Sequence, residues 1–422
     1  MGLEDRRKRF ALEANRAFKR NWARRTAPLQ DASPGNAPRP RMIQLQADTF
    51  TPMQSRVFGL DLMRATAIVL VVFWHSADAF RDFALPSWMP PYVDGVDLFF
   101  VLSGFLIGGI LLKQGAREGI ASWRLLLDFL QRRWLRTLPN YYLFLAANIV
   151  LAAGGITVGV VNHNTWAYAF FLQNLYKPVD LFFWESWSLV VEEWFYLVFA
   201  LFLFACIALG QAPRKAFVIA TALMIIAPLA LRFHLAPEVS SKWQLDQGVR
   251  MLATTRVDSI GWGVLAAWLA SAAPTRWRAA RWPAFAAGLA GMLTNSLFYD
   301  EAWLRYSSTL FFTVNAISMA LLLPLLSSWA RAPRWGAPVV FTSLISYALY
   351  LVHQPVRAMF NRLWHGADRP EGLLLLALYW ITCFAISWLV YRFWEKRFMD
   401  MRAGVSGRLG VDATLNHPGI RR

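Results

Sequence analysis

The sequence predicts an all-α integral membrane protein with about ten transmembrane helices and with its N- and C-termini in the cytoplasm. Of its 422 residues, 57% are hydrophobic and 16% are charged, which is too little charge to cover a soluble protein of this length. The apolar residues gather in runs of about 18 to 23, the length of helix that crosses the hydrocarbon core of a bilayer. Most of the chain is therefore expected inside lipid.

Ten apolar runs are the expected spans. They lie at 58–78, 95–112, 137–155, 188–209, 216–234, 256–273, 283–299, 305–328, 338–360 and 371–392. The segment 162–184 contains a further apolar stretch at 166–175 that is too short to cross a bilayer. We expect an interfacial or re-entrant element there; if it were an eleventh span, the later loops would be turned inside out.

The distribution of charge indicates the orientation. The chain has 43 Lys and Arg against 26 Asp and Glu, a net charge of +17, which in a soluble protein would suggest a nucleic-acid partner. With the N-terminus inside, however, the inner connections at 113–136, 210–215, 274–282 and 329–337 are all basic, and acidic residues gather in the outer connections. This is the positive-inside pattern, so no nucleic-acid partner is expected.

One membrane domain, 56–398, is expected between two cytoplasmic tails. Residues 1–50 hold 11 basic and 5 acidic residues and no apolar core, so they are not a cleaved secretory signal. Within them, 3–25 is either a basic helix on anionic lipid or a disordered positive tail, and 27–41 is a linker rich in Pro and Ala. Residues 399–422 form the second tail. Cys206 and Cys383 lie in apolar runs and are expected to pack, with no disulfide framework and no metal site.

The first span carries two ionisable residues, which lipid tolerates only beside a cavity or a partner. Arg64 and His75 are eleven residues apart, so both leave the same helix face, about 16 Å apart along the axis. His75 is either a general base or nucleophile, or a hydrogen-bonded structural histidine. Arg64 either has a functional role or extends to the inner headgroups.

The fourth span opens with two adjacent carboxylates, Glu192 and Glu193. They are about 100° apart on a helix, so one can face a cavity while the other needs a different partner. We expect Glu192 at the depth of His75, where it would orient the imidazole and offset its positive charge. The alternative is a polar clamp between helices.

Other polar residues are expected near either end of these spans. His353 is predicted in the outer half of the ninth span, at a depth similar to that of His75. Asp97, Arg256 and Asp258 lie at the outer ends of their spans and have either a structural pairing or a chemical role. On the inner side, Arg132, Arg133 and Arg136 are either topology anchors or a phosphate-binding patch.

Seven short motifs together resemble the membrane acyltransferase-3 family. In chain order they are Arg64-x10-His75, the run Phe100–Ile107 that contains Ser103, Arg132-Arg-x-x-Arg136-x-x-Pro139, the run Phe171–Asn174, Trp187-Ser188-Leu-x-x-Glu192-Glu193-x-Phe-Tyr196, Arg256-x-Asp258-x-x-Gly261-x-Gly263 and Ser346-Tyr-x-Leu-Tyr-Leu-x-His353-x-Pro355. The resemblance extends over residues 56–398 and is to the stand-alone form, without an appended hydrolase-like domain.

The resemblance implies a bacterial O-acyltransferase of the cytoplasmic membrane. It would move an acyl group, expected to be acetyl, from cytoplasmic acyl-CoA to a hydroxyl of a polysaccharide, lipopolysaccharide or other glycan or glycolipid. It implies His75 as the catalytic residue with Glu192 and Glu193 as its support, and a donor-binding role for Arg64, Arg132, Arg133 and Arg136. Supporting roles are expected for Asp97, Ser103, Trp187, Ser188, Tyr196, Arg256, Asp258 and His353.

The expected partners are acyl-CoA as a co-substrate, a carbohydrate or lipid-linked sugar acceptor and the lipid bilayer, with no permanently bound cofactor and no prediction of oligomeric state. The alternative function is a transporter or flippase of a glycan or lipid precursor, because ionisable residues in spans also mark transport pathways. A transporter usually has repeated halves with broken helices at matching positions, and the sequence shows no such repeat.

Overall fold

The computed structural model of the protein describes residues 56–79, 93–118, 123–157, 159–177, 182–364 and 369–401. These residues form helices and connecting turns, with no strand in the ranges described. The predicted N-terminal tail at 1–50 and all but three residues of the C-terminal tail at 399–422 lie outside them. The predicted all-α fold class is confirmed.

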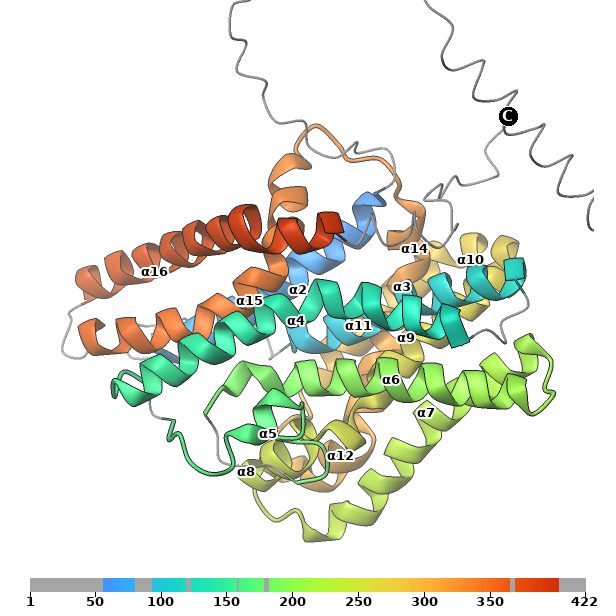
Figure 1. Ribbon diagram of the computed structural model, residues 1–422, viewed down its shortest axis with the longest axis horizontal. Coiled ribbons are helices and arrows are strands. Elements are labelled where there is room, and N and C mark those ends of the chain that lie inside the picture. The colour runs from blue at the N-terminus through green and yellow to red at the C-terminus, as the bar shows by residue number, and fades with distance from the viewer. Residues whose placement is uncertain are drawn as a thin grey trace, which may run out of the picture. The chain divides into compact units, whose positions relative to one another are not determined.

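Each of the ten predicted spans coincides with helix. Nine are single helices: α2 (Phe58–Ala79), α3 (Gly95–Glu118), α4 (Trp123–Ala153), α6 (Trp187–Ala208), α7 (Pro213–Leu235), α9 (Val257–Ala272), α11 (Arg281–Ser296), α15 (Ala337–Trp364) and α16 (Arg369–Val390). The run 305–328 is divided into α12 (Leu304–Thr309), α13 (Phe311–Ala320) and α14 (Leu323–Ser328). Figure 1 shows α15 and α16 side by side, with α2 next to α15.

Seven segments of the described chain are long and apolar enough to cross a bilayer. The segments that contain α4, α9 and α11 are not among them. Helices α9 and α11 have 16 residues each, and the first half of α4 carries arginines. The protein is thus a multi-pass membrane protein, and the number of ten spans stays a prediction.

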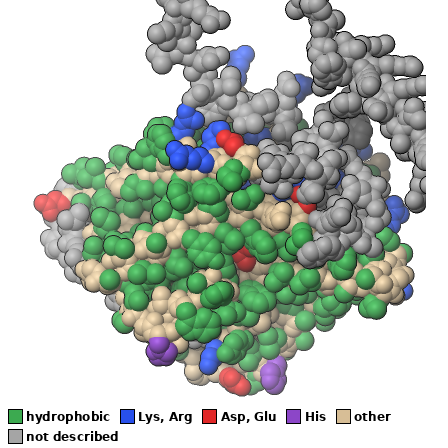
Figure 2. Space-filling view, in the orientation of Figure 1, with side chains coloured by type: hydrophobic (Ala, Val, Ile, Leu, Met, Phe, Trp, Pro, Cys, Tyr) green, Lys and Arg blue, Asp and Glu red, His purple; other side chains and the backbone are tan. Residues whose placement is uncertain are grey.

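The surface of the helices is apolar, as contact with lipid requires. Hydrophobic side chains cover much of the face shown in Figure 2, whereas Lys and Arg gather along its upper edge. On α16, Leu374 and Ile381 are 61% and 64% exposed. A soluble monomer rarely exposes contiguous large apolar side chains in this way, so this face of α16 is suited to lipid.

The described part of the segment between α4 and α6 contains no helix long enough to cross a bilayer. It contains a single helical turn, α5 (Trp166–Ala169), and ends in the 3₁₀ turn η3 (Trp184–Ser186). Tyr141 of α4 stacks on Phe171 with ring centroids 4.2 Å apart, and its hydroxyl donates to the Tyr168 carbonyl at 2.6 Å. The segment therefore packs on α4, as the prediction of a non-spanning element requires.

Helices α3 and α9 approach so closely that two glycines are needed at their contact. A Cβ on Gly104 would lie 2.0 Å from the carbonyl oxygen of Ile260, and a Cβ on Gly263 would lie 2.0 Å from that of Val101. Both clashes are with backbone, which cannot move aside as a flexible side chain can. This close contact sets the relative position of the two helices that carry Asp97, Ser103, Arg256 and Asp258.

We expect Gly104→Ala to lower the free energy of unfolding by about 2 kcal/mol, because the added methyl group overpacks the α3–α9 contact. Gly109→Ala on the same helix is the matched control, since a Cβ there meets nothing within 4 Å. Thermal unfolding of the purified protein in detergent measures both variants. Equal melting temperatures for the two would contradict the close contact.

Candidate active site

Helix α2 connects two groups of polar side chains inside the bundle. It packs against α3, α14 and α15. Near one end of α2, Arg64 faces arginines of α4, and near the other end, His75 contacts α15. Along the axis the two residues are about 16 Å apart. The predicted common face of Arg64 and His75 therefore points into the protein at both ends.

The His75 end is organised by a pair of imidazoles. His75 Nδ1 lies 3.1 Å from His353 Nε2, and His353 Nδ1 lies 2.6 Å from the carbonyl oxygen of Tyr350. A carbonyl only accepts, so we assign the proton of neutral His353 to Nδ1, which leaves Nε2 as an acceptor. His75 Nδ1 then donates to it, and His75 Nε2 keeps its lone pair. That nitrogen can take a proton or attack an acyl carbon.

The predicted depth of His353 is confirmed by this pair, whereas the predicted partnership of Glu192 with His75 is corrected. Glu192 accepts a hydrogen bond from Tyr196 at 2.8 Å, and Glu193 accepts one from Thr137 at 2.7 Å. Within the described ranges, neither carboxylate contacts an imidazole. The reason is the rotation and register of α6, which place Glu192 under the influence of the charges of Arg133, Arg136 and Arg64.

The Arg64 end is strongly basic. Arg64 lies 3.8 Å from Asp61, and both Arg64 and Arg133 experience the charge of Arg136. The guanidinium of Arg133 lies 5.4 Å from the ring centre of Tyr196. In the described part of the chain, Arg136 forms no ion pair. Because carboxylates do not saturate these guanidinium groups, they can bind an anion such as a phosphate.

The fourth predicted donor-binding residue has a different environment. Arg132 forms an ion pair with Asp128 one turn earlier on α4. An i, i+4 pair of this kind is typical of a helix-stabilising contact. The hydroxyl of Ser103 lies 2.5 Å from that of Tyr196. Because Tyr196 also donates to Glu192, the two predicted supporting residues and Glu192 form one chain of hydrogen bonds.

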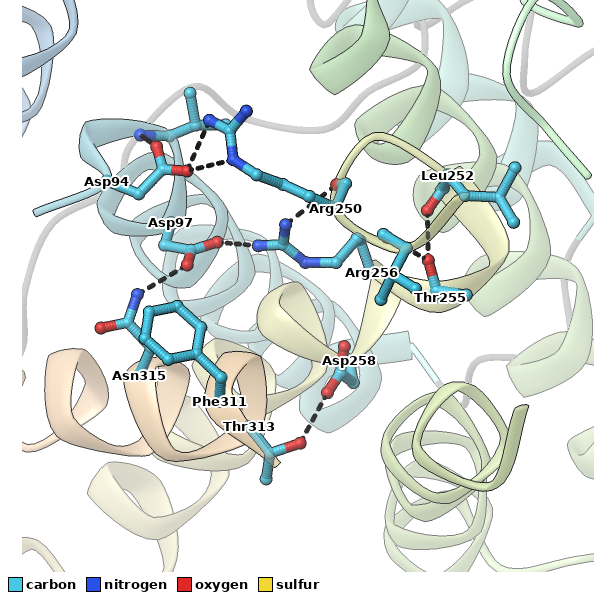
Figure 3. Close-up of polar contacts among 12 residues, drawn as sticks. Asp94, Asp97, Arg250, Leu252, Thr255, Arg256, Asp258, Phe311, Thr313 and Asn315 are labelled. Carbon is cyan, nitrogen blue, oxygen red and sulfur yellow. Dashed lines mark hydrogen bonds and ion pairs between the residues drawn. The ribbon is translucent and has the colours of Figure 1, made fainter. Parts of the chain in front are cut away.

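Two buried ion pairs account for Asp97, Arg256 and Asp258, and Figure 3 shows the first of them, between Arg256 and Asp97. Arg256 pairs with Asp97, and the Asn315 amide donates to the other oxygen of Asp97 at 2.6 Å. Asp97, Arg256 and Asp258 each have 0% exposure. A fully buried charge requires a partner, and here the ion pair and the Asn315 hydrogen bond connect α3, the residue directly before α9 and α13. This arrangement favours structural pairing over a direct chemical role.

The partner of Asp258 was not predicted. It is Arg232, at the end of α7, which lies 2.7 Å from Asp258 and is also fully buried. In the sequence Arg232 resembles an ordinary basic residue at the end of a span. No local sequence signal distinguishes the buried, paired Arg232 from such an ordinary residue, because its partner Asp258 is 26 positions away in the chain.

A third pair brings a charge toward the histidines. Arg250 lies 2.8 Å from Asp94 (Figure 3) and 5.2 Å from the ring centre of Trp187, and its charge acts on His75. Burial alone would raise the pKa of the Asp94 carboxyl, but the guanidinium of Arg250 holds it below its ordinary value. Asp94 therefore carries its charge at neutral pH.

The remaining predicted residues, Trp187 and Ser188, begin α6 and connect it to Asn174 and to Tyr350, which is next to the histidines. The Trp187 carbonyl accepts a hydrogen bond from Asn174 at 3.1 Å. Ser188 Oγ lies 2.6 Å from the hydroxyl of Tyr350, the residue whose carbonyl binds His353. Within the described residues, no group of three or more His, Cys, Asp or Glu could hold a metal ion.

The helices and the imidazole pair define a multi-pass membrane protein with two contacting histidines inside its helical bundle. The chain belongs to the acyltransferase-3 family, described as an acyltransferase domain, which matches residues 57–392. The resemblance predicted from the seven motifs is confirmed. The match to an acyltransferase domain favours the predicted acyl transfer over the alternative function, a transporter or flippase.

Three relatives illustrate the similarity. A Staphylococcus aureus (strain COL) protein named "Putative O-acetyltransferase" is 31% identical over 34% of this chain and 24% of its own length. A Bacillus subtilis protein named "Putative peptidoglycan O-acetyltransferase" is 31% identical over 34% of this chain and 23% of its own. A Komagataeibacter xylinus protein named "Putative membrane-bound transacylase" is 26% identical over 86% of this chain and 88% of its own. No solved structure matches.

Proposed function

We propose that the protein transfers an acyl group, in the first instance acetyl, from cytoplasmic acyl-CoA to a hydroxyl of an envelope glycan or lipid-linked sugar at the cytoplasmic membrane. The observation that carries the proposal is the 3.1 Å contact between His75 Nδ1 and His353 Nε2, from which we assign a free lone pair to His75 Nε2. The membership of an acyltransferase family and the names of two relatives as O-acetyltransferases support it.

The basic cluster of Arg64, Arg133 and Arg136 suits the donor. Acyl-CoA carries its phosphates at one end and its thioester at the other, joined by an extended pantetheine arm. Arg64 and His75 are separated by about 16 Å along α2, so a donor held by its phosphates at the arginines can extend its thioester toward His75. Guanidinium groups bind phosphate oxygens in pairs, which favours this assignment.

The same lone pair supports two chemical routes. As a general base, His75 Nε2 takes the proton of the acceptor hydroxyl, whose oxygen forms a bond to the acyl carbon while the carbon–sulfur bond breaks; the proton then passes to the CoA sulfur. As a nucleophile, Nε2 first attacks the thioester carbon, and the carbon–sulfur bond breaks to release CoA thiolate; the acceptor hydroxyl then attacks the acyl carbon, the bond to Nε2 breaks, and the hydroxyl proton passes to the thiolate. Exchange of labelled CoA into acetyl-CoA without acceptor distinguishes the second route from the first.

The proposed function predicts that a deletion strain loses an acyl substituent from an envelope glycan or glycolipid. Mass spectrometry of envelope fractions from the deletion strain and its parent measures the loss, expected as 42 mass units for each acetyl group in proportion to the wild-type degree of acylation. Expression of the wild-type gene should restore the mass, and expression of the His75→Ala variant should not. Identical spectra for deletion strain and parent would contradict the proposal.

A further inference from the structure

A carboxylate lies next to the basic cluster. Asp61 is one turn before Arg64 on α2, and in the part of the chain that the structure describes it is the carboxylate closest to that guanidinium. An aspartate and an arginine three positions apart on a helix usually pair directly. Such a pair would use the N–H groups that the proposed function assigns to the donor phosphates. A phosphate site at Arg64 therefore requires that Asp61 be occupied by other partners.

Arg56 occupies both oxygens of Asp61. Its Nη2 atom donates to Oδ1 at 2.5 Å, and its Nε atom donates to Oδ2 at 2.9 Å. This is the bidentate geometry for which a guanidinium is suited. The hydroxyl of Ser343, on α15, also donates to Oδ1 at 2.7 Å. Asp61 thus accepts three side-chain hydrogen bonds, from Arg56 and Ser343, and it is only 4% exposed.

Arg64 keeps its own N–H groups. Its Nη1 atom lies 3.8 Å from Asp61 Oδ1, which is too far for a hydrogen bond. Its side chain is 17% exposed, and within the described ranges its guanidinium donates to no other side chain. Arg64 therefore has a counter-charge nearby but unused donors, which is the condition for binding an anion.

We propose that Arg56 is a positioning residue for the acyl-CoA donor: it occupies the Asp61 carboxylate, so that Arg64 stays available to the donor phosphates. The inference rests on the proposed function and adds to it a residue that the motifs did not indicate as functional. Arg56 acts through Asp61, and no bond of the reaction forms or breaks at either side chain.

Binding of CoA, which keeps the phosphates of the donor, tests the proposal. The full chain is purified in nanodiscs, and isothermal titration calorimetry gives the Kd for CoA. We expect Arg56→Gln to raise this Kd about 5-fold, because Asp61 then pairs with Arg64 and that ion pair must break when phosphate binds. The kcat for acetyl transfer should change less than about 2-fold, since the variant removes no group from the reacting atoms.

An exposed arginine gives the matched control. Arg334 lies in the predicted inner connection 329–337, so Arg334→Gln removes the same charge without touching Asp61. Its Kd for CoA should stay within about 2-fold of wild type. An equal rise in Kd for Arg334→Gln and Arg56→Gln would show an effect of net charge alone and would overturn the inference.

Two double variants give the deciding result. Asp61→Asn in the Arg56→Gln background removes the competing carboxylate, so the Kd for CoA should return to within about 2-fold of wild type. In an Arg64→Ala background, Arg56→Gln should change the Kd by less than about 2-fold, because Arg56 acts through Arg64. A merely structural defect would persist in both backgrounds. An unchanged Kd for Arg56→Gln alone, or no recovery with Asp61→Asn, would refute the role of Arg56.

Failure of the inference differs from failure of the proposed function. If wild-type protein binds CoA and Arg56→Gln binds it equally well, the role of Arg56 alone is refuted. If wild-type protein does not bind CoA, or His75→Ala transfers acetyl groups as fast as wild type, the proposed function fails and the inference with it. Should Arg56→Gln not accumulate in the membrane, the double variant with Asp61→Asn decides: a wild-type Kd supports the inference, and weaker binding opposes it.

Discussion

His75→Ala is expected to lower the rate of acyl transfer by at least about 100-fold while the protein stays folded in the membrane. A positioned general base contributes about 10²- to 10⁴-fold to a rate. The rate of CoA release from acetyl-CoA in nanodiscs, with the glycan fraction of the deletion strain as acceptor, measures the effect.

The control for this variant is another histidine in a membrane helix. His234 near the end of α7 is exposed, so His234→Ala should transfer acyl groups at the wild-type rate. The melting temperature of each variant separates a loss of chemistry from a loss of fold. A His75→Ala variant with half or more of wild-type activity would remove His75 from the mechanism and with it the proposed function.

Arg136→Ala is expected to raise the KM for acetyl-CoA about 10-fold, with little change in the KM for the acceptor. A charge-assisted hydrogen bond to phosphate contributes about 1.5–3 kcal/mol, and each 1.4 kcal/mol corresponds to about tenfold in affinity. Arg136 has no ion-pair partner in the described part of the chain, so its loss breaks no direct ion pair there. Initial rates measured at varied donor and at varied acceptor concentrations separate the two constants.

A second arginine provides the comparison for the donor site. Arg278 lies exposed in the short helix α10 (Pro274–Ala279), also in a predicted inner connection. Arg278→Ala removes the same charge without touching the basic cluster, so it should leave both Michaelis constants unchanged. Equal increases for donor and acceptor in Arg136→Ala, or the same increase in Arg278→Ala, would be evidence against phosphate binding by Arg136.

The sequence predicted the helical elements well because each depends on a local property. The apolar run that forms α2 or α15 predicts a membrane helix from its own residues, independently of the helices that pack against it. The boundaries of α4 were less well predicted: the expected span is 137–155, whereas the helix begins at Trp123. Its first half is basic, and hydropathy does not detect a helix of that composition.

The candidate site was predicted residue by residue, but its pairings were not. His75, His353 and the arginines of α4 could be identified from charge in an apolar context and from motif spacing. The expected contact between Glu192 and His75 is wrong, because Glu192 lies with Arg64 and the arginines of α4 at the other end of α2, and hydropathy does not fix the depth of α6 relative to α2. Arg232 was missed as the partner of Asp258, since it lies near the end of a span, where charged residues are ordinary.

By itself, the sequence determined the class of protein and the family, and it predicted the approximate spans and the orientation. These follow from hydropathy, charge and short motifs, which act within about twenty residues along the chain. The tertiary structure decided which polar groups meet: His75 with His353, Glu192 with Tyr196, and Arg232 with Asp258. The reason is physical: a buried polar group is stabilised by the partner across a helix contact, and the packing and rotation of distant helices set that contact.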